Sequence, residues 1–309
     1  MITDAELTRA AALLREGKLV AIPTETVYGL AANALDPAAV ERIYAAKGRP
    51  ATSPLIVHVA DKAMARSLAR HWPETAELLA ARFWPGPLTM VVPKAAHVPD
   101  NVTAGLDTVG LRMPSHPVAL ELIRRAGVPI AAPSANRFTQ LSPTTAGHVR
   151  QAFGDAIECI LDGGPCEVGI ESTVLSLSGA EPVLLRPGII SREQLEEALG
   201  RPVAIGGTVE GAHPSPGMHH KHYAPRTPVH LVRDGQLPSG RGAYLWIERP
   251  ADAELAIPMP ADPMRYARFL YEALHRADAA QLEWIAIEEP PATEVWRAVN
   301  DRLRRAACR

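Results

Sequence analysis

Short strings that combine Gly or Pro with hydroxyl, amide and cationic side chains gather in the first two thirds of this chain. The seven strings are PTETVYGL (23–30), AKGRP (46–50), FWPGPLT (83–89), GLRMPSHP (110–117), APSANRF (132–138), ESTV (171–174) and LRPG (185–188). Such residues suit loops that present backbone donors, hydroxyls and fixed positive charge to an anion. Their concentration in one region predicts a single site for a phosphorylated ligand.

The first two strings offer hydroxyls and cations. Thr24 and Thr26 follow a short apolar strand, in a loop that Gly29 is expected to let turn. The two hydroxyls can face a small polar ligand or belong to an ordinary strand-to-helix connection. Lys47 and Arg49 flank a glycine at the end of a helix. Cations there either complement the helix dipole or converge on phosphates.

The later strings add one buried cation and several short polar groups. Arg112 lies inside an apolar strand, where an unpaired charge would be costly, so it needs a structural ion pair or a carboxylate ligand. Ser134, Asn136 and Ser172 stand at strand ends, and Arg186 lies beside Pro-Gly. Individually, the short polar residues are ordinary turn residues.

Hydrophobic periodicity and capping residues predict alternating helices and strands through residue 201. We expect helices at 4–15, from 36, from 61, at 117–126, 144–153 and 191–200, and strands at 19–22, 55–59, 88–92, 108–113, 128–131, 157–161, 173–177 and 183–185. This order predicts an α/β domain over residues 1–201 around a largely buried sheet. Its strings fall in strand-end loops, where open α/β sheets bind ligands.

Periodicity disappears over residues 202–228, which we interpret as a linker and active-site flap. Its histidines lack the spacing of a zinc-binding helix, so no metal site is predicted at His213, His219, His220 or His222. Residues 229–309 predict a smaller α/β domain, with strands at 229–232, 243–247 and 283–287 and helices at 263–276 and from 293. The tail at 301–309 carries four arginines, interpreted as a solvated helix end rather than an RNA contact.

Composition excludes several classes of protein. The 309 residues are 47% hydrophobic, and the net charge of −2 argues against a protein wrapped generally in nucleic acid. No signal-peptide pattern opens the chain and no apolar run is long enough for a membrane span, which predicts a cytoplasmic protein. P-loop, dinucleotide-binding and hydrolase-elbow motifs receive no support from the sequence.

Taken in order, the strings resemble those of the threonylcarbamoyl-AMP synthase family in its long, two-domain form. The resemblance is strong over residues 5–200, extends to SPGMHHKHYAP at 215–225, and is looser in the C-terminal unit, which is shorter than usual. It implies a YrdC-like domain with a twisted, open mixed sheet, flanking helices and a concave, positively charged face. A smaller, Rossmann-like α/β domain is expected to follow.

The resemblance implies condensation of L-threonine, bicarbonate and ATP into threonylcarbamoyl-AMP, with release of pyrophosphate. Mg²⁺ is expected to accompany the ATP. The product would pass to the tRNA threonylcarbamoyl-transfer machinery, which modifies the adenosine next to the anticodon (t6A). Two alternatives remain open from the residues: a non-catalytic module that binds double-stranded RNA or tRNA, and a different ligase or carbamoyl transferase on the same fold.

The resemblance also assigns roles to individual residues. The catalytic residues are expected to be Lys47 and Arg49. The expected threonine subsite consists of Thr26, His58, Arg112, Ala132 and Ser172. The expected ATP subsite consists of Arg49, Ser53, Thr108, Ser134, Asn136, Ser142, Arg186 and Tyr223. The family usually has Asn where this chain has Ser53.

Overall fold

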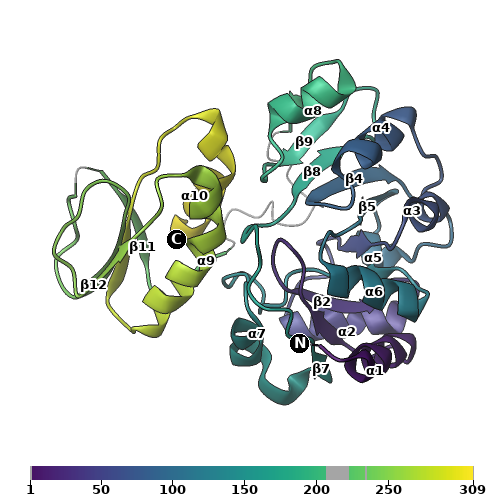
Figure 1. The fold of residues 1–309 in the computed structure, drawn as a ribbon, viewed down its shortest axis with the longest axis horizontal. Coiled ribbons are helices and arrows are strands. Elements are labelled where there is room, and N and C mark those ends of the chain that lie inside the picture. Colours follow the sequence, from purple (N-terminus) through teal and green to yellow (C-terminus); the bar gives the residue numbers. More distant parts are fainter. Residues whose placement is uncertain (1, 207–222, 234, 309) are drawn as a thin grey trace.

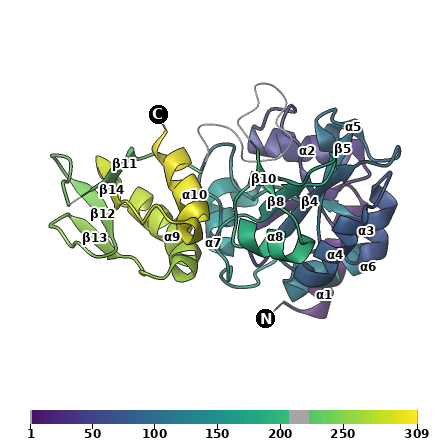
Figure 2. The ribbon, with the colours of Figure 1, turned by 90° about the horizontal axis from the view of Figure 1, so that it is seen from above.

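The computed structural model describes residues 2–206, 223–233 and 235–308, which form two α/β units. In Figures 1 and 2, α9 (Pro263–Ala279) and α10 (Arg297–Ala307) lie between the sheet of the smaller, C-terminal unit and the larger, N-terminal unit. These two helices are therefore placed to connect the C-terminal sheet with the rest of the molecule.

The larger unit is built on a ten-stranded mixed sheet in the order β10-β9-β8-β4-β5-β3-β6-β2-β1-β7. Its strands are β1 (Val20–Ile22), β2 (Gly29–Asn33), β3 (Ile56–His58), β4 (Leu88–Pro93), β5 (Thr108–Arg112), β6 (Ile130–Ala131), β7 (Cys159–Ile160), β8 (Thr173–Ser176), β9 (Val183–Arg186) and β10 (Ala204–Ile205). The pair β3 and β5 is parallel, whereas β4 and β5 are antiparallel. The expected mixed sheet with flanking helices is confirmed.

Capping residues begin several helices of this unit, as the sequence predicts. Thr3 and Glu6 form a capping box at the start of one helix, Ser191 and Gln194 form another, and Asp36 caps a third. The helices are α1 (Asp4–Arg15), α2 (Pro37–Lys47), α3 (Lys62–Leu68), α4 (Glu74–Phe83), α5 (Asp100–Thr103), α6 (Pro117–Ala126), α7 (Ala146–Phe153) and α8 (Arg192–Leu199), with a 3₁₀ turn η1 (Gly154–Ala156).

The smaller unit has a four-stranded, fully parallel sheet in the order β11-β14-β12-β13. Its strands are β11 (Val229–Val232), β12 (Gly242–Trp246), β13 (Leu255–Pro258) and β14 (Trp284–Glu288), and a 3₁₀ turn η2 (Glu294–Trp296) precedes α10. This agrees with the expected Rossmann-like unit. Within the described residues, no helix combines the length and apolar character that crossing a membrane requires.

Five helices and strands depart from the sequence-based expectations: β2, β13, α4 and α5 were not predicted, and β10 lies in the expected linker. The expectation that Gly29 turns the chain is wrong, because this residue begins β2. A Cβ at Gly29 would lie 3.2 Å from the Cβ of Ala132, so a side chain there would fit only if Ala132 moved by a few tenths of an ångström. The larger sheet also continues to Ile205, since β10 pairs with β9.

An apolar cluster joins the two units. Ile170 of the larger unit packs in one buried cluster with Leu270 and Tyr271 of α9. The backbones meet at Gly169, which has a φ of +79°, and a Cβ there would lie 2.5 Å from the Cα of Arg268. Only glycine combines a relaxed backbone at this positive φ with the lack of a Cβ that would clash with Arg268. The C-terminal unit is thus packed directly against the segment that precedes the ESTV string.

Candidate active site

A narrow cavity lies where the C-terminal ends of β3, β5 and β9 meet the loops around residues 24–27, 132–134 and 171–172. It encloses about 40 Å³ of free space. Predicted site residues make up most of its lining: Thr26, Arg49, His58, Arg112, Ala132, Ser134, Ser172, Arg186 and Tyr223. The structure therefore brings the ends of distant strings together, as expected for strand-end loops of an α/β sheet.

Three arginines dominate the charge of the cavity wall. Arg49, Arg112 and Arg186 are each at most 6% exposed, and Glu171 is the one carboxylate among the lining residues. Guanidinium groups removed from water interact strongly with an anion and can bind its oxygens through paired N–H donors. The cavity is thus suited to a ligand with carboxylate or phosphate groups.

Arg112 approaches a carboxylate that lies behind the cavity wall. Its Nη2 is 2.7 Å from Oε1 of Glu25, and both side chains are 4% exposed. The Nε and Nη2 atoms of Arg112 and both carboxylate oxygens of Glu25 nevertheless lack a hydrogen-bond partner within the described part of the chain. The short distance shows the structural ion pair that the sequence left open. The donors of Arg112 without a hydrogen-bond partner could still bind a ligand.

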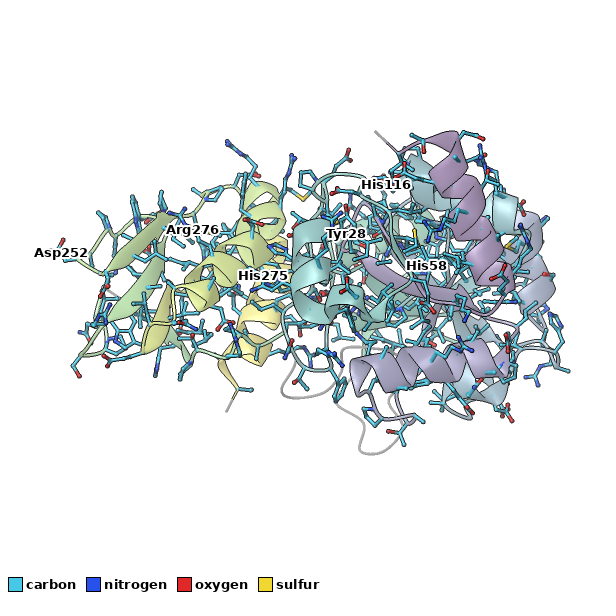
Figure 3. All side chains as sticks on the ribbon, turned by 90° about the horizontal axis from the view of Figure 1, so that it is seen from below. Tyr28, His58, His116, Asp252, His275 and Arg276 are labelled. Atoms are coloured by element: carbon cyan, nitrogen blue, oxygen red, sulfur yellow. The ribbon has the colours of Figure 1, made fainter. Side chains whose placement is uncertain are left out.

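His58 is a neutral group beside this ion pair. Figure 3 places it within the larger unit. Burial, reinforced by the charge of Arg112, lowers the pKa of His58 to about 3. Its Nδ1 is buried and has no hydrogen-bond partner within the described residues. The ring can therefore offer a hydrogen bond to a ligand without adding charge.

Lys47 holds the loop of the APSANRF string. Its ammonium group donates to the carbonyl oxygens of Ser134 at 2.5 Å and Asn136 at 2.6 Å. Burial, together with the charge of Arg49, keeps the pKa of Lys47 well below its usual value. In this conformation Lys47 positions the loop that carries two predicted ATP-binding residues, and its catalytic role stays a prediction.

Arg49 is fixed by the turn that follows α2. Its guanidinium group donates to the hydroxyl of Ser53 and, at 3.1 Å, to the carbonyl oxygen of Pro54. It also lies over the ring of Phe138, 5.9 Å from the ring centre. Burial lowers the pKa of Arg49 to about 10. Ser53 thus contributes by holding Arg49 rather than by lining the cavity itself.

Arg186 and Ser172 form one unit at the opposite wall. The guanidinium group donates through Nε to the carbonyl oxygen of Ser172 at 3.1 Å and through Nη2 to its hydroxyl at 3.0 Å. The Ser172 hydroxyl also lies 2.8 Å from that of Thr89. Two predicted ligand residues, one for each substrate, are therefore mechanically coupled.

Of three further predicted site residues, Thr108 and Ser142 do not line the cavity, whereas Tyr223 does. Thr108 begins β5, at the end of the strand opposite Arg112, and does not line the cavity. Ser142 contributes indirectly, by donating to Glu171 at 2.6 Å. Tyr223 lines the wall with a φ of +61°, at the edge of the described residues.

Sequence reasoning missed Glu25, Glu171 and Arg302 as parts of this site. Both glutamates stand inside strings that were singled out, beside predicted hydroxyl ligands, and that position was an available signal. No feature of the sequence indicated a role for Arg302. The interpretation of its tail as a solvated helix end is wrong for this residue, although Arg304 is exposed as expected. Arg302 is 1% exposed, and its Nε lies 2.7 Å from Oε2 of Glu171.

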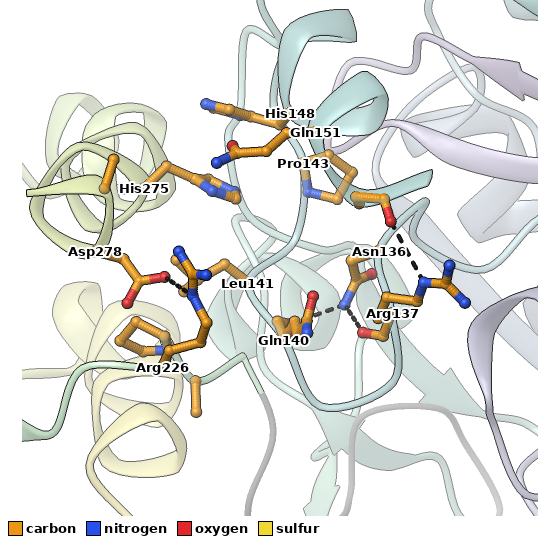
Figure 4. A pocket seen from close by; sticks show the side chains of 14 residues that line it. Asn136, Arg137, Gln140, Leu141, Pro143, His148, Gln151, Arg226, His275 and Asp278 are labelled. Carbon is orange, nitrogen blue, oxygen red and sulfur yellow. Dashed lines mark hydrogen bonds and ion pairs between the residues drawn. The ribbon is translucent and has the colours of Figure 1, made fainter. Parts of the chain in front are cut away.

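A second cavity, of about 310 Å³, lies at the boundary between the units and is shown in Figure 4. Of the predicted site residues, it includes Asn136, whose amide donates to the carbonyl oxygens of Arg137 and Gln140. Its two arginines are engaged, because Arg137 donates to backbone carbonyls and Arg226 pairs with Asp278 at 3.2 Å. The smaller, arginine-lined cavity contains nine of the predicted site residues, and we take it as the candidate site for that reason.

The described residues offer no cluster of three His, Cys, Asp or Glu side chains that could hold a metal ion. The only carboxylate in the described wall of the arginine-lined cavity, Glu171, is already paired with Arg302. The predicted flap lies mostly outside the described residues, and so do its Lys221, His213, His219, His220 and His222.

Comparison with known proteins places these features in a family. A family model described as "Telomere recombination" matches residues 12–188, and one described as "Threonylcarbamoyl-AMP synthase, C-terminal domain" matches residues 190–308. A threonylcarbamoyl-AMP synthase of Pyrococcus abyssi is 44% identical, with 99% of this chain and 95% of the relative covered. One of Bacillus subtilis is 45% identical, with coverages of 98% and 93%.

A solved structure agrees with this match over both units. The crystal structure of P. abyssi Sua5 complexed with L-threonine superposes with a TM-score of 0.93 at 43% identity, covering 99% of this chain and 95% of that one. The similarity therefore extends over the N-terminal sheet, the cavity and the C-terminal unit. The chain belongs to the threonylcarbamoyl-AMP synthase family.

Proposed function

We propose that this protein is an L-threonylcarbamoyladenylate synthase, a nucleotidyltransferase that converts L-threonine, bicarbonate and ATP into threonylcarbamoyl-AMP and pyrophosphate. The observation that carries the proposal is the full-length similarity to relatives named for this activity, at 44% and 45% identity. The cavity supports it, because buried arginines and hydroxyls suit a carboxylate and a polyphosphate. The protein then works in the cytoplasm and supplies the tRNA threonylcarbamoyl-transfer machinery.

The proposed reaction has two steps. The threonine amine combines with bicarbonate to give a carbamate and water. A carbamate oxygen then attacks the α-phosphorus of ATP, and the bond to the β-phosphate oxygen breaks as pyrophosphate leaves. Such chemistry depends on positioning and on neutralising developing charge rather than on a protein nucleophile.

The threonine subsite is proposed at the end of the cavity where Arg112 lies. Arg112 binds the carboxylate of threonine with its remaining donors, and the neutral ring of His58 offers a hydrogen bond nearby. Thr26 and Ser172 face the hydroxyl and amine, and the backbone at Ala132 completes the wall. This assignment gives the one acidic group of threonine to an arginine that is buried among polar residues.

The ATP subsite is proposed around Arg49, Arg186 and Ser134, with Tyr223 as a further wall. The two arginines stabilise charge on the phosphates, and their bonds to Ser53 and Ser172 hold them in place before ATP arrives. Mg²⁺ bound to the triphosphate supplies further neutralisation when present. Lys47 acts through the loop that it holds, and Asn136, Ser142 and Thr108 complete the proposed set.

Pyrophosphate release tests this proposal directly. The purified chain is incubated with Mg²⁺-ATP, and pyrophosphate is measured with both threonine and bicarbonate, with each one omitted, and with neither. We expect release only when both are present. RNA binding that weakens with salt, with no ATP turnover, would instead identify the non-catalytic RNA-binding module. Turnover with another amine or carboxylate would identify a different ligase.

A further inference from the structure

Arg302 is a buried cation that α10 of the C-terminal unit places behind the cavity wall, next to Glu171. It is 1% exposed, and its Nε lies 2.7 Å from Oε2 of Glu171. Its Nη2 donates to the carbonyl oxygen of Glu171 at 3.3 Å, and Nη1 lies 2.7 Å from Asp301. The guanidinium group also lies over the ring of Tyr223, 5.4 Å from the ring centre. One side chain of the C-terminal unit therefore contacts both the side chain and the backbone of the ESTV string.

Glu171 is the link between Arg302 and the cavity. This residue lines the cavity, and it directly precedes Ser172, which binds Arg186. Its Oε1 accepts a hydrogen bond from Ser142 at 2.6 Å, and both oxygens lie 3.2 Å from the hydroxyl of Tyr271. The carboxylate thus has partners from both units, of which Arg302 is the only cation in direct ion-pair contact among the described residues.

Charge balance depends on this contact. Burial by itself raises the pKa of Glu171. The charges of Arg302 and Arg186, together with hydrogen bonds from Ser142 and Arg302, outweigh burial and leave the pKa below its ordinary value. The carboxylate therefore stays ionised. Without Arg302 its negative charge would be left to compete for Arg186, on the wall where the phosphates are proposed to lie. A buried carboxylate that loses its partner is costly and repels an anionic ligand.

We propose that Arg302 is a positioning residue of the nucleotide subsite. It neutralises Glu171, so that this carboxylate does not compete with the phosphates of ATP for Arg186. The inference rests on the proposed function. It gives the C-terminal unit a specific role, which is to complete the electrostatics of a cavity formed mainly by the larger unit. Arg302 itself does not line the cavity and acts through Glu171.

A charge-balance cycle tests the role of Arg302. The variants are Arg302→Gln, Glu171→Gln and the double variant, and kcat and KM are measured for ATP and threonine in the pyrophosphate assay. We expect Arg302→Gln to raise the KM for ATP about tenfold or more, since one phosphate contact is weakened by a competing buried charge. The KM for threonine should change far less. The double variant should regain most of the loss, because no uncompensated carboxylate remains.

Arg305→Gln is the matched control. Arg305 lies on the same helix, pairs with Asp301 at 3.0 Å and is not bonded to Glu171 in the described contacts. This variant should keep the wild-type KM for ATP. Arg302→Lys, which retains the charge, should fall between wild type and Arg302→Gln. Thermal unfolding of every variant identifies a folding failure. If Arg302→Gln fails to fold, the double variant is compared with wild type instead, because its neutral pair removes the destabilising charge.

The alternative outcomes are distinct. A double variant as impaired in ATP binding as Arg302→Gln, or an Arg302→Gln variant with an unchanged KM for ATP, overturns the positioning role. Equal increases in the KM for ATP and for threonine also overturn it, since they indicate general loosening of the interface. Failure of the proposed function appears separately, as a wild-type protein that releases no pyrophosphate.

Discussion

Two arginines of the cavity, Arg49 and Arg186, are held in place by hydrogen bonds to the chain itself. Arg186 is bonded to Ser172, and Arg49 to the turn at Ser53 and Pro54. Donors fixed in this way need little rearrangement when charge develops, which is the general advantage of a preorganised site. The same bonds also satisfy buried backbone carbonyls. Substitutions at these arginines should therefore affect binding and folding together.

Arg186→Lys separates charge from geometry. Lysine keeps the positive charge but cannot reproduce two parallel donors to Ser172. We expect the KM for ATP to rise about tenfold and the free energy of unfolding to fall by about 1–2 kcal/mol, the range of a lost buried hydrogen bond. Kinetics and urea unfolding measure the two effects. Arg82→Lys, at an exposed pair with Glu197, should change neither, and a wild-type KM in Arg186→Lys would remove Arg186 from the ATP subsite.

Selectivity for threonine over valine should be high. The two amino acids have nearly the same shape, but valine lacks the hydroxyl. The proposed subsite contains buried polar groups at Thr26, His58 and Ser172. A group left unpaired by valine carries a desolvation cost, so we expect kcat/KM for valine to be lower by at least about 100-fold. Competition between the two substrates measures the ratio. Comparable kcat/KM values for threonine and valine would mean that the pocket selects its substrate by shape alone.

At the scale of elements, local signals in the sequence predicted helices and loops well. Asp36 before Pro37, and Ser191 with Gln194, mark real helix starts because a cap acts within one turn. The motif strings likewise predicted most of the cavity lining. What local signals could not predict is the pairing of Arg302 with Glu171, 131 residues apart in the sequence. From the sequence alone, a basic tail on a helix is predicted to be exposed to solvent. The burial of Arg302 follows only from the packing of α10 against the larger unit.

Two stacked histidines join α7 and α9 across the boundary between the units. The rings of His148 and His275 are 3.8 Å apart, and Figure 3 shows His275 at this border. Nδ1 of His148 faces the backbone N–H of Thr144, and Nε2 of His275 lies 3.1 Å from the carbonyl oxygen of Ser142. Burial lowers the pKa of each ring to about 4, with the charge of His148 adding to the shift at His275. Both rings are therefore neutral near pH 7.

This stack predicts acid-sensitive stability. The folded pKa values lie below the unfolded value of about 6.5, so the unfolded chain binds more protons between about pH 6.5 and 4. Stability is then fully present above that window and is lost as pH falls, by up to about 1.4 kcal/mol per pH unit for each ring. Urea unfolding at pH 7.5 and pH 5 measures the loss. His275→Gln keeps a donor for Ser142 but cannot titrate, so its pH dependence should be shallower.

Nearby carboxylates do not account for the expected difference between the two proteins. Glu272 and Asp278 face the stack, and they are present in both wild type and His275→Gln. Their contribution to the pH dependence should largely cancel in the comparison. An identical loss of stability in the two proteins would show that His275 does not titrate in this window.

At the scale of the molecule, the two units share a buried interface that is both apolar and charged. Ile170 packs with Leu270 and Tyr271, and Arg302 pairs with Glu171 beside them. Separating the units would expose the apolar cluster and leave a carboxylate and an arginine without their partner. Such an interface should couple the stability of one unit to that of the other, whereas units joined only by a tether would unfold independently.

We therefore expect calorimetry of the full chain to give one unfolding transition, with a calorimetric enthalpy equal to the van't Hoff enthalpy. Mg²⁺-ATP and threonine bind only the folded protein and should raise that single Tm, in proportion to the logarithm of ligand concentration once the site is saturated. The proposed site lies mainly in the larger unit, so a shift of the whole transition reports coupling through the interface. Two transitions, of which only one shifts to higher temperature with ligand, would show that the C-terminal unit unfolds independently of the unit that contains the proposed active site.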